Sequence, residues 1–192
     1  MKTETSLRQV HKFTVHDYYK MAEIGILTED SRVELIEGEI IDMVPIGSKH
    51  ASMVTKLTRI LTKMVGDSAI ISPQNPLHLP NDSEPEPDIM ILRPRVDDYG
   101  DSHPEPDDVL LLIEVSDTSL PFDRLVKLPL YARYKVPVVW IIDLNSQHLE
   151  LYRQPQNGEY GEYDCLYGNS LAPLPTLLMC IKVGDLFSPR TV

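Results

Sequence analysis

The order of apolar and polar residues predicts two amphipathic helices near the N-terminus. The first begins at Thr14, which forms a T-x-x-D pattern with Asp17 that is typical of a helix capping box. The second spans residues 51–65, where apolar side chains recur every three or four positions. Gly66 follows it, at a position where glycine commonly ends a helix.

Between and after these helices, short aliphatic runs predict β-strands. The segment RVELIEGEIIDM indicates a hairpin that turns at Glu37-Gly38 and carries Glu34 on its first strand. Further strand-like runs occupy residues 69–72, 77–79, 88–92, 109–115 and 138–142. The run VLLLIEV at 109–115 is apolar without alternation, which is typical of a strand buried on both faces. We therefore expect it at the centre of a sheet covered by helices.

The second half of the chain predicts a crossover connection and a terminal strand pair. Residues 123–134 should form a helix that joins two parallel strands. Pro129 lies inside it and should kink it or delay its start, because an interior proline costs about 3 kcal/mol. HLELYR and EYDCLY indicate a terminal antiparallel pair. The expected fold class is α/β, or α+β with a central mixed β-sheet flanked by helices and an N-terminal β-hairpin.

Length and composition narrow the class of protein. At 192 residues without a long linker, the chain should form one domain over 1–192, with its core at about 14–187. Cys165 and Cys180 lack the spacing of a zinc site or a disulfide scaffold. Neither a signal segment nor an apolar run of about 18 residues occurs, so we expect a soluble, cytoplasmic protein.

The net charge of the chain is -11, with 18 lysines and arginines against 29 acidic residues. This balance opposes non-specific nucleic-acid binding, which depends on cations that neutralise phosphates. Two effects moderate the objection: carboxylates in a site count as negative until a metal binds, and a local basic face can coexist with an acidic total.

Two carboxylates and a lysine near strand ends form the main candidate for chemistry. Asp88 follows Pro87 in EPEPDIMIL, Glu114 lies near the end of LLLIEVS, and Lys127 falls on the predicted helix. Two acids and one lysine at the rim of a sheet can hold a divalent cation and activate water against a phosphodiester. The pattern therefore indicates a metal-dependent nuclease.

Six segments, taken in order, resemble the Uma-two-type restriction endonuclease family of the PD-(D/E)xK nuclease superfamily. They are RVELIEGEIIDM, the histidine of GSKHAS, EPEPDIMIL, LLLIEVS, DRLVKLPLYARYKV and VVWIID. The resemblance extends from Val15 to Phe187. It implies a restriction-endonuclease-like core, one or two divalent ions such as Mg²⁺ or Mn²⁺, DNA as the partner, and a homodimer.

The resemblance assigns roles to four residues of the catalytic motif. Asp88 matches the aspartate of PD, and Glu114 matches the second acid. Ser116 stands where the linear motif has its lysine, and Lys127, four residues before Tyr131, matches a lysine supplied from the following helix. Magnesium keeps several waters, so these two carboxylates and the Val115 carbonyl could suffice as protein ligands.

Two further residues match the family outside that motif. Glu34 corresponds to an additional acid before the core strands, and His50 corresponds to a recurring histidine at the start of the second helix. We expect Glu34 to assist catalysis. His50, Ser116 and Tyr131 are expected to support the groups that touch metal or substrate.

Each candidate also has a structural alternative. Asp88 could be a turn residue after proline. Glu114 needs a partner if buried, and a salt bridge to Arg124 or Lys127 would supply one without catalysis. Lys127 could merely pair with Asp123 on a helix face.

The remaining candidates have similar alternatives. Glu34 could be an exposed hairpin residue, and His50 a hydrogen-bonding residue at a helix start. Tyr131 and Trp140 could fill the core.

The functional hypothesis is a metal-dependent DNA endonuclease that hydrolyses phosphodiester bonds. One alternative is a nuclease-fold binding module with weak or no cleavage, favoured by the acidic charge, the missing in-line lysine and Pro129. Another is a hydrolase of small nucleotide substrates, which need not hold a long polyanion.

Overall fold

The computed structural model describes residues 10–28, 30–175 and 179–188. The chain divides into two compact units, one made of Met1–Val44 and Leu79–Pro85 and the other of Pro45–His78 and Glu86–Val192. The expectation of a single domain stays a prediction. Within the described residues, no helix is long and apolar enough to cross a membrane.

The first unit contains the predicted helix and hairpin. Its elements are α1 (Val15–Glu23), β1 (Val33–Ile36) and β2 (Glu39–Asp42). The capping box is confirmed, because the Thr14 hydroxyl accepts from the Asp17 amide at 3.1 Å and the Asp17 carboxylate accepts from the Thr14 amide at 2.9 Å. β1 and β2 pair antiparallel. Glu34 on β1 is 4% exposed, which excludes the alternative of an exposed hairpin residue.

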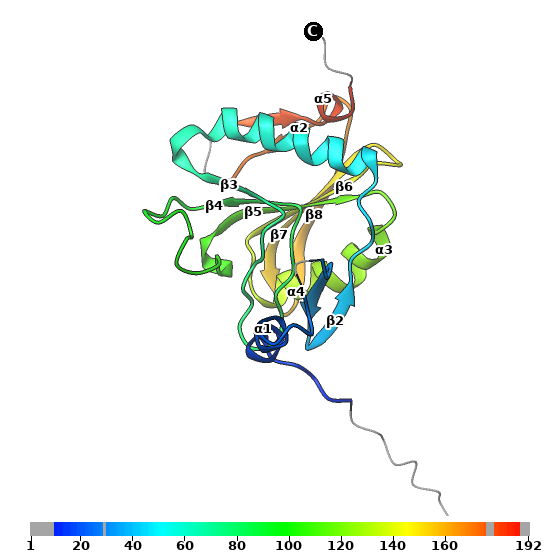
Figure 1. The fold of residues 1–192 in the computed structure, drawn as a ribbon. Helices are drawn as coiled ribbons and strands as arrows, with labels where there is room; N and C mark the ends of the chain where they lie inside the picture. Colours follow the sequence, from blue (N-terminus) through cyan, green and yellow to red (C-terminus); the bar gives the residue numbers. More distant parts are fainter. Residues whose placement is uncertain (1–9, 29, 176–178, 189–192) are drawn as a thin grey trace, which may run out of the picture. The chain divides into compact units, whose positions relative to one another are not determined.

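The second unit is built on a mixed six-stranded sheet (Figure 1). Its order is β3-β4-β5-β6-β7-β8, with β5 and β6 parallel and the other neighbours antiparallel. The strands are β3 (Ile70–Pro73), β4 (Ile89–Leu92), β5 (Val109–Ser116), β6 (Val138–Asp143), β7 (His148–Gln156) and β8 (Glu159–Tyr167). The predicted central mixed sheet is confirmed. All eight residues of β5 are buried, as its continuous apolar sequence indicated.

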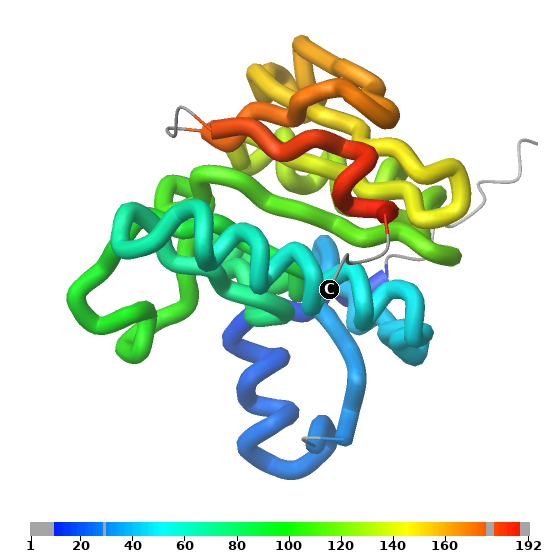
Figure 2. The backbone as a smooth tube through the Cα atoms, turned by 90° about the horizontal axis from the view of Figure 1, so that it is seen from above, coloured from blue at the N-terminus to red at the C-terminus, as the bar shows by residue number. Residues whose placement is uncertain are grey.

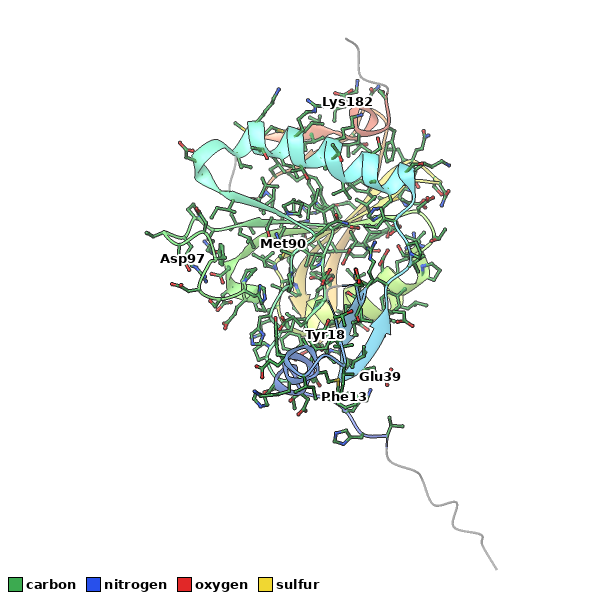
Figure 3. The ribbon with its side chains drawn as sticks, in the orientation of Figure 1. Phe13, Tyr18, Glu39, Met90, Asp97 and Lys182 are labelled. Atoms are coloured by element: carbon green, nitrogen blue, oxygen red, sulfur yellow. The ribbon has the colours of Figure 1, made fainter. Side chains whose placement is uncertain are left out.

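Helices of the second unit cover both faces of this sheet. α2 (Ser48–Val65) lies along one face with α5 (Val183–Phe187) beside it (Figures 1 and 2). The short strands β9 (Leu171–Pro173) and β10 (Cys180–Lys182) pair near α5, and Figure 3 shows Lys182 on that side. The remaining short helices are η1 (Gly66–Ser68), η2 (Pro106–Asp108), α3 (Leu120–Phe122), η3 (Asp123–Lys127) and α4 (Leu128–Arg133).

Alternation along β5 divides the core from the candidate site. Leu111, Ile113 and Val115 pack in the apolar cluster that includes the buried side of α2. Glu114 and Ser116 point to the opposite face, because successive side chains of a strand alternate. The α3-η3-α4 connection covers that face and contacts β7 and β8 through α4. The sheet therefore presents one apolar face and one face with buried polar groups.

The connection from β5 to β6 shows how the sequence accommodates Pro129. η3 is a π-helical turn, and α4 begins at Leu128, so the proline falls in the first turn of α4. The Leu128 amide donates to the Asp123 carbonyl, five residues back, so a π turn precedes the proline, which itself has no amide to donate. Helical backbone already runs through α3 and η3 before Pro129, so the expected late helix start is wrong, and the expected kink stays a prediction.

Two parts of the strand prediction need correction or addition. Residues 77–79 form no strand, and only Leu79 makes an isolated bridge, to Ser83. Pro76 and Pro80 flank this run and lack the amide donors that a ladder requires. β9, β10 and α5 gave no sequence signal. The β7–β8 pair is confirmed, and it turns tightly through Asn157 and Gly158, whose positive φ of 52° and 82° suits an Asn-Gly hairpin.

We predict that Leu57→Ala destabilises the second unit by about 2–5 kcal/mol, because the fully buried leucine would leave a cavity in the core. Urea denaturation can follow it through Trp140, the only tryptophan, which lies in the same apolar cluster. Thr62→Ala, on the exposed side of α2, should change stability by less than about 0.5 kcal/mol. Equal midpoints for the two variants would contradict this account of the core.

Candidate active site

Asp88 is held in place from two sides just before β4 begins. The Val115 amide donates to its Oδ2 at 2.8 Å, and His50 Nε2 lies 2.9 Å from the same oxygen. The β4–β5 register places Ile89 opposite Ile113, which brings Asp88 opposite Glu114 on the adjacent strand. His50 therefore acts as a partner of Asp88 rather than only as a helix-start residue.

Glu114 is buried and contacts the crossover connection. It is 3% exposed, and the Tyr131 hydroxyl donates to its Oε1 at 2.6 Å. Lys127 Nζ lies 3.5 Å from the same oxygen, with only 6% of Lys127 exposed. The lysine that the linear motif lacks thus reaches the second acid from η3. Tyr131 is also fully buried, so it combines a core position with a polar contact.

Asp123 belongs to the same group, although the sequence suggested it only as a helix-face partner of Lys127. It is 4% exposed and accepts from the Ser116 hydroxyl at 2.6 Å and the Ser119 hydroxyl at 2.7 Å. The signal was present in the four-residue spacing of Asp123 and Lys127, which places both on one side of a helix. Ser116, in the position of the missing lysine, is the residue that joins β5 to Asp123.

Burial dominates the electrostatics of these acids. The pKa of Glu114 is raised to about 8, chiefly by loss of solvent. The nearby Asp123 and Asp88 contribute to the rise, and Lys127 and the Tyr131 hydrogen bond oppose it. The pKa of Asp123 is also raised by burial. The hydrogen bond to Asp88 raises the pKa of His50. Without a cation, Glu114 is therefore mostly protonated near neutral pH, which limits the negative charge in a region with little water.

The donor chemistry fits a divalent cation. Three carboxylates lie close enough to influence one another, and carboxylate oxygens are the ligands that Mg²⁺ and Mn²⁺ prefer. A cation would offset the cost of burying Glu114 in its ionised form. Among residues 10–28, 30–175 and 179–188, however, no three His, Cys, Asp or Glu side chains are arranged to hold a metal. Any ion must therefore bind through fewer side chains together with backbone oxygens or water.

The sequence left open whether Arg124 or Lys127 pairs with Glu114. Its guanidinium pairs with Glu150 on β7, while Lys127 is the cation beside Glu114. Glu150 is 1% exposed and also accepts from Tyr152 at 2.7 Å and contacts His148 at 3.0 Å. The Arg124–Glu150 pair anchors η3 to β7.

The structure brings most sequence-predicted residues together within the second unit. Asp88, Glu114 and Lys127 converge with their supporting residues His50, Ser116 and Tyr131. Glu34 belongs to the first unit, so its part in the site stays a prediction.

We predict that Glu114→Gln changes how stability depends on pH in metal-free protein. The folded-state pKa of Glu114, about 8, lies above the ordinary value of 4.5, so the folded state binds more protons between these values. Wild-type stability should therefore fall as pH rises from 5 to 8, by up to about 1.4 kcal/mol per pH unit from this group. Glu114→Gln should remove this contribution. The free energy of unfolding is measured by urea denaturation at several pH values for both proteins. An equal change with pH in the two proteins would refute the assignment.

Comparison with known proteins supports the same fold. A solved structure titled "putative nuclease belonging to DUF820" from Anabaena variabilis ATCC 29413 is similar, with a TM-score of 0.70 and 20% sequence identity. The match covers 91% of this chain and 97% of that chain, and it shows that the two proteins share a fold. No curated protein matches. The Uma2 family model matches residues 15–182, so this chain belongs to the Uma2 family, which is described as "Putative restriction endonuclease".

Proposed function

We propose that the protein is a metal-dependent DNA endonuclease. The observation that carries the proposal is the convergence of two carboxylates and a buried lysine on one end of β5. Asp88 is hydrogen-bonded to the residue that follows Glu114, and Lys127 lies 3.5 Å from Glu114 Oε1. Family membership supports phosphodiester hydrolysis as the reaction.

Asp88, Glu114 and the Val115 carbonyl would hold the metal, Mg²⁺ or Mn²⁺. Such an ion lowers the pKa of a bound water and stabilises negative charge on phosphate oxygens. The protein residues orient the groups that would bind this ion. His50 and the Val115 amide both contact Oδ2 of Asp88, which fixes the carboxylate and leaves Oδ1 as the candidate donor.

Lys127 would orient the attacking water or stabilise the charge that develops on the phosphate. Glu114 and Asp123 are its buried counter-charges. Tyr131 fixes Glu114 through Oε1, and Ser116 fixes Asp123. We further propose that Glu34 adds an acidic group to the reaction and that a homodimer cuts the two strands of a duplex.

We expect wild-type protein with Mg²⁺ or Mn²⁺ to nick or cut plasmid DNA at low salt. Asp88→Asn, Glu114→Gln and Lys127→Met should each lower the cleavage rate at least about 100-fold, because each removes a group that contacts metal or reacting atoms. Gel assays of supercoiled plasmid measure the rate. Asp107→Asn, a matched charge change at an exposed site on η2, should cleave as wild type does.

Cleavage that survives Asp88→Asn would remove the basis of the proposal. If folded wild type cleaves neither plasmid nor single-stranded DNA, calorimetric titration with Mn²⁺ distinguishes the two alternative functions, a small-substrate hydrolase and a binding module. Metal binding with activity on nucleotides would indicate a small-substrate hydrolase. Absence of metal binding would indicate a binding module.

A further inference from the structure

α2 is a basic helix in an acidic protein. Its 18 residues, SKHASMVTKLTRILTKMV, contain Lys49, Lys56, Arg59 and Lys63 and no aspartate or glutamate. The whole chain carries a net charge of -11. A concentration of cations without neighbouring acids on the same helix is therefore a local reversal of charge.

The spacing of these cations places them on one side of the helix. At 3.6 residues per turn, the four positions fall within a stripe about 80° wide, and Lys49 and Lys63 are about 21 Å apart along the axis. The buried residues Met53, Leu57 and Leu61 occupy the neighbouring side, against the sheet. The stripe therefore runs along the flank of α2, where Lys56 contacts α5. Figure 2 shows α5 beside α2.

Lys56 differs from the other three because it is used to hold α5. Its Nζ donates to the carbonyls of Asp185 at 2.6 Å, Leu186 at 2.8 Å and Ser188 at 2.7 Å. In the described part of the chain, Lys49, Arg59 and Lys63 form neither ion pairs nor side-chain hydrogen bonds. We call these three residues the basic stripe. Their charges are available to a partner.

A groove borders the stripe. It has a volume of about 660 Å³ and lies between α2 and α5. Lys49, Lys56 and Arg59 line it together with the hydroxyl residues Ser52 and Thr55. No acidic side chain is among the described residues that line it. Its walls also include the apolar side chains of Leu144, Leu186 and Phe187, and the Thr55 hydroxyl donates to the Ala51 carbonyl. Lys49, Arg59 and the Ser52 hydroxyl remain as groups that suit the phosphate oxygens of a nucleic-acid backbone.

The basic stripe begins beside the candidate active site. Lys49 is adjacent to His50, whose ring contacts the Asp88 carboxylate at 2.9 Å. Cα atoms of neighbouring residues are about 3.8 Å apart, so the first cation of the stripe lies next to the group that supports Asp88. The N-terminal end of α2, where the stripe starts, therefore lies near Asp88, while the rest of α2 covers the sheet face opposite to Glu114.

We propose that the basic stripe, Lys49, Arg59 and Lys63, binds the phosphate backbone of the DNA substrate without reading its bases. This inference rests on the proposed function. The stripe's length of about 21 Å matches about six base pairs at 3.4 Å each. It supplies local cations to a protein whose total charge would otherwise repel DNA.

Fluorescence anisotropy of a labelled duplex, measured in EDTA between about 50 and 200 mM salt, tests the stripe. Lys49→Gln, Arg59→Gln and Lys63→Gln should each reduce the slope of log affinity against log salt by about 0.9, and the triple variant by about 2.7. Lys135→Gln removes an exposed cation beyond α4 and should keep the wild-type slope. Circular dichroism and thermal unfolding establish that each variant is folded.

A second assay separates docking from chemistry. Bis(p-nitrophenyl) phosphate is too small to span the stripe, so with Mn²⁺ the triple variant should hydrolyse it at the wild-type rate while cleaving plasmid more slowly. A triple variant that binds duplex with the wild-type affinity and slope overturns the stripe proposal, as does wild type that shows no salt-dependent binding. If wild type binds duplex through the stripe but hydrolyses neither substrate, the proposed function fails and the stripe stands.

Discussion

The structure of the candidate site depends on one costly feature, the carboxylate of Glu114 inside the protein. An unpaired acid at this depth would lose several kcal/mol of hydration. The crossover connection supplies Lys127 and Tyr131 to the same oxygen. The position of η3 follows from the need to surround this acid with polar partners. Asp88 and Asp123 add like charge near it and are held by donors of their own.

Much of this could be predicted from the sequence because the pattern of apolar residues along the chain indicates which segments are buried. The continuous apolar run ending near Glu114 located the central strand, and the crossover to β6 followed from chain order. Asp123 was missed as a buried group because its partners, Ser116 and Ser119, are hydroxyl residues whose contacts require tertiary structure. The β9–β10 pair was missed because three-residue strands are too short to show periodicity.

The charge distribution reconciles an acidic chain with a polyanionic substrate. Some of the acids lie in the buried group, where a proton or a bound cation can neutralise Glu114. Basic residues are gathered on α2, whose first turn also carries His50. Net charge is a property of the whole chain, whereas binding depends on the potential at one surface. The two need not have the same sign.

The π-helical turn of η3 makes the length of the connection as important as its composition. Asp123 and Lys127, at its two ends, both point into the protein. Each residue of an α-helix turns the chain by about 100°, so the loss of one residue here would swing Lys127 away from Glu114 while every side chain was retained. Relatives that differ by a single insertion or deletion in this turn could therefore keep the fold and every motif residue but lose catalytic activity.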